Sequence, residues 1–336
     1  MDQILQMFVS IGLGVGGMLL YYFGSNLILD TALRDQMDKQ GSVTRSFARL
    51  REQIRPWLFI APAILLLGLF LVYPALRTVY LSFFNDTTRD YVGLDNYRWA
   101  LEDTGFRQSI QNNVAWLLVV PFGSTAFGLV IAVLADRVRW ESVAKSFIFM
   151  PMAISFVGAA IIWKFVYAYR AADQTQIGAL NAFVVWLGGE PRTWFTEPPL
   201  NNFMLMIILI WIQTGFAMVL LSAALKNIPE EIIEAARIDG ANEIQVFFRV
   251  MIPQIMGTIA VVMTTIIIVV LKVFDIVYTM TNGQFKTEVL ANYMYRWMFR
   301  NFDFGRGSMI SVTIMIAVLP ILYWNIRRFL EEEQIR

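Results

Sequence analysis

Seven long apolar stretches run through this chain of 336 residues and restrict its fold more than any other feature. A helix needs about 20 residues to cross the roughly 30 Å hydrocarbon core of a bilayer. In that core every backbone polar group must be paired within the protein, so open strands are excluded. The stretches are Ile4–Leu29, Trp57–Leu81, Val114–Ala135, Phe147–Ala168, Phe203–Ala223, Ile255–Tyr278 and Met309–Ile326. They predict an all-α integral membrane protein with about seven transmembrane helices.

The composition supports a membrane location and excludes several kinds of chemistry. Hydrophobic residues make up 57% of the chain and charged residues 16%, whereas soluble domains average roughly 45–50% and about 25%. The chain has no cysteine and no histidine, which excludes disulfides, zinc sites built on these ligands and Ser-His-Asp triads. We therefore expect no catalytic residue and no bound metal. The net charge of +1, without a basic run interleaved with aromatic residues, predicts no nucleic-acid partner.

Basic residues around the stretches predict the orientation. If the amino terminus lies outside, the inner segments hold 15 lysines and arginines and the outer segments hold 9. Cytoplasmic loops are enriched in these residues, so the amino terminus is expected outside and the carboxy terminus in the cytoplasm. No basic residue precedes the first stretch, whereas a cluster at Arg45–Arg55 follows it, which favours a retained helix over a cleaved signal peptide.

These features predict three parts in the chain. An extra amino-terminal transmembrane helix occupies residues 1–30, and a basic cytoplasmic linker occupies residues 31–55. The transmembrane domain proper then extends over residues 56–330 and contains the six remaining apolar stretches.

A polar segment between the fifth and sixth stretches predicts two short helices joined by a turn. Pro229 and the acids after it suit the start of an amphipathic helix that runs to Ile238. Gly240 ends this helix, because glycine accepts a positive φ without steric strain, and a helical pattern resumes over Ala241–Val250. The residues expected along one side are Ile232, Ala235, Ala236 and Ile238, with Glu231 and Glu234 exposed.

An interfacial helix pair lying on the lipid headgroups is the simpler interpretation of this segment, because it needs only amphipathicity. Acidic residues suit that role poorly, since the cytoplasmic leaflet is itself anionic. A polar segment of this kind suits a loop that a partner outside the membrane binds. The sequence therefore favours a docking element over a headgroup anchor.

The segment resembles the EAA loop of the inner-membrane permeases of binding-protein-dependent ABC importers. The residues that match its pattern in register are Glu234, Ala235, Ala236, Gly240, Val250, Ile252 and Pro253. The resemblance implies a type I ABC importer permease fold with one extra amino-terminal helix. It also implies a cytoplasmic coupling loop near 224–253 that docks in a cleft of an ATPase subunit. The docking residues implied in this way are Glu234, Ala235, Ala236, Asp239 and Gly240.

Other segments resemble the carbohydrate branch of these permeases, in the half that includes the maltose and glycerol-phosphate permeases. They are Pro56–Phe84, Gly93–Tyr97, Ser146–Pro151, Thr281–Gly283 and Asn292–Gly307. The extra amino-terminal helix is most similar to the α-glucoside subgroup. The resemblance implies an ATP-driven sugar importer of the bacterial cytoplasmic (inner) membrane, in which this chain forms half of the translocation path.

The same resemblance implies the partners of the chain. They are a second permease subunit, two ATPase subunits and an extracytoplasmic sugar-binding protein, all assembled around the lipid bilayer. The sequence contains no G-x-x-x-x-G-K-[ST] motif for cradling phosphates. ATP and Mg are therefore expected on the partner subunits, and this chain is expected to bind no cofactor and to catalyse no reaction itself.

In this family the sugar rests near mid-membrane, between the spans that flank the coupling loop. The candidate residues of the substrate path are Trp211, Gln213, Phe216, Thr264 and Thr265. Gln213 needs a polar partner in lipid, and either a cavity or a hydrogen bond between helices satisfies it. The aromatic rings suit stacking on sugars, although packing is their commoner use. Lys272 and Asp275, three residues apart, are expected to form an internal ion pair.

Three alternatives remain open at this stage. A secondary transporter coupled to protons or sodium needs acids inside the membrane, and only Asp275 qualifies, near the end of a stretch. A membrane enzyme has little chemistry to use without histidine or cysteine. An importer of the same ATP-driven type could carry a different cargo, such as a polyamine, phosphate or a metal oxyanion.

Overall fold

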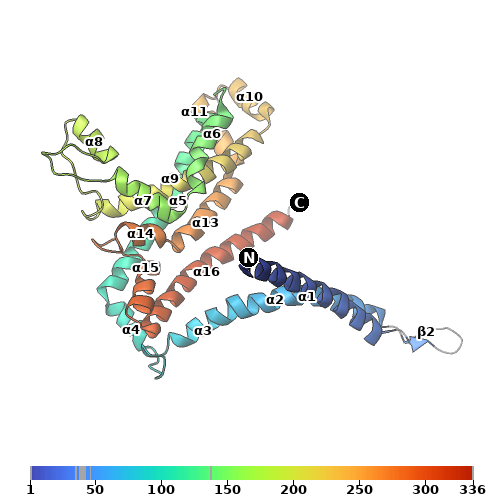
Figure 1. Cartoon of the computed structure of the whole chain (residues 1–336). Coiled ribbons are helices and arrows are strands. Elements are labelled where there is room, and N and C mark those ends of the chain that lie inside the picture. Colours follow the sequence, from blue (N-terminus) through green and yellow to red (C-terminus); the bar gives the residue numbers. More distant parts are fainter. Residues whose placement is uncertain (1, 35, 38–42, 46, 137, 335–336) are drawn as a thin grey trace. The chain divides into compact units, whose positions relative to one another are not determined.

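The computed structural model describes residues 2–34, 36–37, 43–45, 47–136 and 138–334. In this part of the chain the regular structure is helical apart from one antiparallel hairpin of two short strands, β1 (Gln36–Met37) and β2 (Val43–Arg45). The chain divides into two compact units, residues 1–77 and residues 78–336 (Figure 1). The predicted all-α fold class is confirmed.

The first unit is built on two helices, α1 (Asp2–Ala32) and α2 (Ala48–Leu67), and α2 continues through the π-helical turn η1 (Gly68–Val72) into α3 (Tyr73–Leu81). Tyr21 and Tyr22 of α1 donate their hydroxyl hydrogens to the carbonyls of Leu58 and Phe59, at 2.9 and 3.1 Å. Because α2 begins at Ala48, the last part of the expected linker at 31–55 is helical rather than extended.

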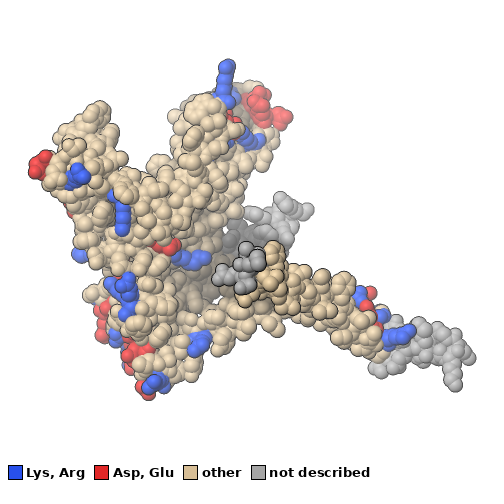
Figure 2. All heavy atoms as spheres, viewed as in Figure 1, with Lys and Arg blue, Asp and Glu red and all other residues tan. Residues whose placement is uncertain are grey.

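The second unit contains the remaining helices. They are α4 (Asp95–Glu102), α5 (Thr104–Ala135), α6 (Glu141–Phe149), η2 (Met150–Ala153), α7 (Phe156–Val166), α8 (Ala179–Trp186), α9 (Leu200–Lys226), α10 (Glu230–Ile238), α11 (Glu243–Gln245), η3 (Val246–Met251), α12 (Ile252–Gln254), α13 (Met256–Leu271), α14 (Asp275–Met280), α15 (Leu290–Tyr295), η4 (Arg296–Arg300) and α16 (Phe304–Gln334). On the face of this unit shown in Figure 2, charged side chains gather over α8 and around α10, and the helix sides between them are mainly uncharged.

The centre of the second unit is the packing of α5 against α9, and α13 packs against both of these helices. The two helices approach closely at Gly128, where an added Cβ would lie 2.6 Å from the Cβ of Ala217. Small residues at a helix interface allow this approach, which gains dispersion contacts where lipid supplies no hydrophobic driving force. Farther along the same interface, Trp116 is fully buried and donates its indole hydrogen to Asn202 Oδ1 at 2.9 Å.

Five described helices are long and apolar enough to cross a membrane, and up to seven spans result if each of two bent helix pairs counts as one. The five are Leu5–Ala32, Ala48–Leu81, Thr104–Ala135, Leu200–Lys226 and Phe304–Trp324. The bent pairs are Glu141–Ala153 with Phe156–Val166, at 105°, and Glu243–Gln254 with Met256–Leu271, at 70°. The prediction of about seven spans agrees with this count.

The first bend has a local cause at Pro151, which lies within the expected span Phe147–Ala168. Pro151 lacks the amide hydrogen that would continue α6, and the chain passes through the short 3-10 turn η2. Ser155 then starts α7, because its hydroxyl oxygen accepts a hydrogen bond from the Gly158 amide at 3.1 Å. The predicted span is therefore two helices that meet at a steep angle.

A group of asparagines on α5 and α9 holds the loop between α14 and α15. Asn112 donates to the carbonyls of Lys286 and Glu288, at 2.8 and 2.7 Å, and Asn201 donates to the Phe285 carbonyl at 2.7 Å. Phe285 and Lys286 both have positive φ, at 56° and 63°, which non-glycine residues seldom adopt. The asparagine side chains thus stabilise a backbone path that the loop would not take by itself.

Asn112→Ala is expected to destabilise the second unit. The substitution leaves the Glu288 carbonyl without its donor in a buried position, a loss of about 1–3 kcal/mol, and it also removes the partly buried bond to the Lys286 carbonyl. Thermal unfolding of the detergent-solubilised protein, followed by tryptophan fluorescence, measures the effect against Asn301→Ala, which removes an exposed asparagine. Equal melting temperatures for the two variants would show that the asparagines do not hold the loop.

Candidate functional site

The polar loop between α9 and α13 contains the docking residues predicted from the sequence. Helix α10 begins at Glu230, directly after Pro229, and ends at Ile238, so the predicted helix is confirmed. Its first turn carries Glu230 and Glu231, and negative charge there is favourable beside the helix amino terminus. Helices α10 and α11 lie at one end of the second unit and pack against η3 (Figure 1).

The turn after α10 depends on glycine. Gly240 has a φ of +85°, and its amide donates to the Arg237 carbonyl at 3.0 Å, while the Ala241 amide donates to the Ala236 carbonyl at 3.0 Å. A Cβ built on Gly240 would meet no described atom of the chain within 4 Å. Glycine is therefore required by the backbone conformation, and the space in front of it is open.

The helix that follows is anchored by a capping box. The Asn242 side chain accepts a hydrogen bond from the Gln245 amide, and the Gln245 side chain accepts one from the Asn242 amide, each at 2.9 Å. This reciprocal pair satisfies two amides that a helix start leaves open. The spacing of Asn242 and Gln245 matches the sequence signature of a capping box, which the sequence analysis overlooked.

The structure buries a different side of α10 from the one expected. Ile233 and Ala236 are half-buried against the rest of the loop, whereas Ile232 and Ala235 are exposed and Ile238 is 86% exposed. Glu231 and Glu234 are exposed, as predicted. The outward surface of α10 therefore combines small and aliphatic side chains with carboxylates, and it has no cover within the described part of the chain.

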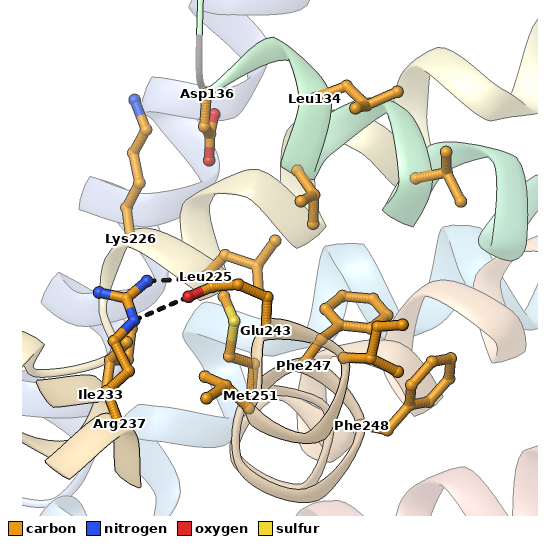
Figure 3. Close-up of a pocket in the computed structure, with 14 residues that line it drawn as sticks. Leu134, Asp136, Leu225, Lys226, Ile233, Arg237, Glu243, Phe247, Phe248 and Met251 are labelled. Carbon is orange, nitrogen blue, oxygen red and sulfur yellow. Dashed lines mark hydrogen bonds and ion pairs between the residues drawn. The ribbon is translucent and has the colours of Figure 1, made fainter. Parts of the chain in front are cut away.

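Behind α10 lies a mainly apolar cavity of about 440 Å³, lined by the ends of α5 and α9 and by α10, α11 and η3 (Figure 3). Ile233 and Phe247 line it, and Arg237 crosses its edge to pair with Glu243, with Nε–Oε1 at 2.9 Å and Nη2–Oε2 at 3.3 Å. The Glu243 carboxylate raises the pKa of the Arg237 guanidinium above its usual value. Both side chains are half-exposed, so this pair contributes more to the angle between α10 and α11 than to stability.

The five candidate residues of the substrate path are mostly engaged in helix packing. Trp211 packs edge-on against Trp163, with ring centroids 5.8 Å apart, and Phe216 is half-buried against the apolar core. Gln213 is buried on α9. Thr264 is buried and Thr265 exposed on α13, and each donates its hydroxyl to a carbonyl four residues earlier. Their role in the path stays a prediction.

The predicted ion pair between Lys272 and Asp275 was wrong. Both residues are described, and the structure forms no ion pair between them. Helix α13 ends at Leu271 and α14 begins at Asp275, so the two residues stand on either side of a break. A spacing of three residues brings side chains together only on a continuous helix, which the chain does not form here.

The family model described as "Binding-protein-dependent transport system inner membrane component" matches residues 124–334. The alpha-glucoside transport system permease protein AglF of Rhizobium meliloti is 59% identical over 333 residues, covering 99% of each chain. The osmoprotective compounds uptake permease protein GgtC of Synechocystis sp. is 53% identical over 279 residues, which cover 83% of this chain and 100% of that protein. The resemblance stated from the sequence is confirmed.

A solved structure shares the fold. A chain of a bacterial alginate ABC transporter, crystallised with an alginate pentasaccharide-bound periplasmic protein, superposes with a TM-score of 0.70. The alignment covers 82% of this chain and 95% of that chain at 22% identity. The type I ABC importer permease fold predicted from the polar loop is therefore confirmed.

Gly240→Val is expected to loosen the turn between α10 and α11, whereas Gly240→Asn should keep it. Valine at positive φ is strongly disfavoured, at a cost of about 1–2 kcal/mol, while asparagine tolerates that conformation. Limited trypsin digestion at Arg237 and Arg249 in the purified protein measures the opening of the turn. Faster cleavage is expected in the valine variant alone. Equal cleavage rates in both variants would contradict the view that the positive φ of residue 240 maintains the turn.

Proposed function

This chain belongs to the binding-protein-dependent transport system inner membrane component family, and on that premise we propose that it carries an α-glucoside or a related oligosaccharide. A member of this family is a multi-pass permease subunit of an ABC importer in the inner membrane. It transports and does not hydrolyse ATP, since the ATPase activity belongs to separate subunits, and a substrate-binding protein delivers the cargo.

The proposed cargo rests on the identity and coverage of the relatives. AglF matches 99% of this chain, which includes the amino-terminal helix that resembles the α-glucoside subgroup. The lactose transport system permease protein LacF of Rhizobium radiobacter, at 30% identity over 298 residues, is a second sugar permease. GgtC, at 53% identity, supports an osmoprotective compound as the second candidate cargo.

The proposed coupling site is the outward surface of α10 with the turn at Gly240. Glu234 and Asp239 would meet basic groups of an ATPase subunit, while Ala235, Ala236 and Gly240 permit close approach. One observation carries this proposal: contacts within the chain fix the inner side of the loop, while its outer side is exposed. The capping box and the Arg237–Glu243 pair hold it, and no described atom occupies the space before Gly240.

The finer assembly is part of the same proposal. A second permease subunit supplies the other half of the path, and two ATPase subunits bind one coupling loop each. The amino terminus lies outside and the carboxy terminus in the cytoplasm, with an extra helix at 1–30, a linker at 31–55 and the permease domain at 56–330. ATP and Mg act on the partner subunits, and this chain binds no cofactor.

In the proposed mechanism, ATP draws the two ATPase subunits together, and α10 moves with its ATPase as a rigid body. The helices on either side of the loop follow, and the path changes from inward-facing to outward-facing to receive sugar from the binding protein. The sugar then passes the region of Trp211, Gln213, Phe216, Thr264 and Thr265. ATP shifts this equilibrium only by its differential affinity for the two states.

Gly240→Asn and Gly240→Val are both expected to reduce sugar uptake about tenfold or more in cells that depend on this importer. The asparagine variant keeps the turn, so its loss of uptake would come from a side chain placed on the docking surface. Gly188→Asn is the matched control, because Gly188 has the same φ of +85° and the same open surroundings outside the loop. Normal uptake in both Gly240 variants, with the protein inserted, would refute the coupling role.

Uptake of labelled maltose and trehalose is expected to be inhibited by vanadate and to persist with an uncoupler. Glycine betaine serves as the probe for an osmoprotective cargo in the same cells. Preferential uptake of glycine betaine would favour the second candidate. Inhibition by the uncoupler alone would point instead to coupling with an ion gradient.

A further inference from the structure

A compact charge cluster joins three helices immediately behind the α10 loop. Lys145 Nζ lies 2.5 Å from Asp136 Oδ1 and 2.5 Å from Glu141 Oε1, and it also donates to Ser222 Oγ. Ser222 donates in turn to Asp136 Oδ1 at 2.9 Å, and Lys226 pairs with Glu141. We call these five residues, Asp136, Glu141, Lys145, Ser222 and Lys226, the elbow cluster.

The elbow cluster is more than a surface ion pair. The Lys145 side chain is only 16% exposed, and its three ammonium hydrogens have three acceptors on three helices. Exposed ion pairs contribute little because water and salt screen them. A shielded lysine is different, since its removal leaves the partly buried Asp136 carboxylate without its counter-charge, while Glu141 keeps Lys226.

The members of the cluster belong to three different elements. Asp136 caps α5, Glu141 and Lys145 lie on the first turns of α6, and Ser222 and Lys226 lie on the last turns of α9. Only residues 227–229 separate α9 from α10. The cluster therefore stands between the proposed coupling helix and the helices of the path.

A second contact between α6 and α9, apart from the elbow cluster, restricts how the two helices can move relative to each other. At Gly215 of α9 an added Cβ would lie 2.6 Å from the Ile148 carbonyl oxygen, so the backbones of the two elements are in close contact there. Gly215 and Ser222 are seven residues apart, which is two turns or about 10 Å along α9. Two attachments at this separation prevent α6 from rotating about α9, whereas a single one permits it.

Rotation of α6 would matter because α6 and α7 meet at 105°. A small rotation at the first attachment becomes a sideways displacement of α7. We propose that Lys145 is a positioning residue that makes the α5–α6 junction and α7 move with α9 when α10 is displaced. This inference rests on the proposed function of α10 as the coupling helix, and it assigns to Lys145 no contact with sugar or ATP.

Lys145→Met is expected to separate ATP hydrolysis from transport in the complete transporter reconstituted into proteoliposomes with its binding protein. Hydrolysis should stay within about twofold of the wild-type rate, while sugar imported per ATP should fall at least about fivefold. Lys145→Arg should restore most of the ratio, because it keeps the charge and the donors. Lys164→Met, which removes an exposed lysine on α7, should leave the ratio unchanged.

A distance measured directly between α6 and α9 distinguishes a loss of coupling from poor folding of the variant. The chain contains no cysteine, so Val143→Cys on α6 and Ala223→Cys on α9 introduce the only labelling sites of this subunit. Electron–electron double resonance between spin labels there should give one narrow distance, equal in nucleotide-free and vanadate-trapped states. In the Lys145→Met background the distance should broaden or change between the states.

The outcomes distinguish this inference from the function on which it rests. If Gly240→Val and Gly240→Asn both transport normally, the coupling role of α10 fails and the role of Lys145 fails with it. If Gly240→Val blocks transport but Lys145→Met keeps the wild-type ratio and a narrow distance, only the role of Lys145 is refuted. Equal losses of hydrolysis and transport in Lys145→Met, with no rescue by arginine and an unchanged distance, would also refute it.

Discussion

Pairing of backbone polar groups inside a bilayer is the constraint on which this architecture depends. Helices satisfy it within each span, and the side chains are then left to hold the helices together. Lipid offers little hydrophobic drive for that association, so close packing and side-chain hydrogen bonds must supply it. The pair α5 and α9 shows both means, with the backbone approach at Gly128 and the buried hydrogen bond from Trp116 to Asn202.

The polar contacts of this helix pair lie at its two ends. At one end Asn202 donates to Asn112, and Asn112 and Asn201 hold the loop before α15. At the other end Asp136 and Ser222 share the Lys145 ammonium group. Between the two ends no side-chain hydrogen bond joins the two helices, both of which are fully described. Contacts at both ends restrict rotation and sliding of α5 relative to α9. A displacement at one end of the pair is therefore transmitted to the other end.

The loop at α10 is held by contacts within the chain on its inner side, and its outer side is exposed in the described structure. Its inner side is defined by Ile233 in the cavity, the Arg237–Glu243 pair and the capping box at Asn242. Its outer side carries Glu234, Ala235 and Ile238 without cover in the described chain. The contacts on the inner side let the loop transmit a displacement to the helices, and the exposed outer side lets a partner protein bind it. The proposed coupling role requires both properties together.

The amino-acid sequence by itself determined the apolar spans, the helix from Glu230 to Ile238 and the turn at Gly240. Each depends on residues within a few positions of one another, through hydrophobic length, capping or φ. Only the tertiary structure decided that Ile233 faces inward, that the chain breaks between Lys272 and Asp275, and that Lys145 reaches Ser222, 77 residues away. Such contacts arise when separate helices pack, and no local pattern in the chain encodes which side chains then meet.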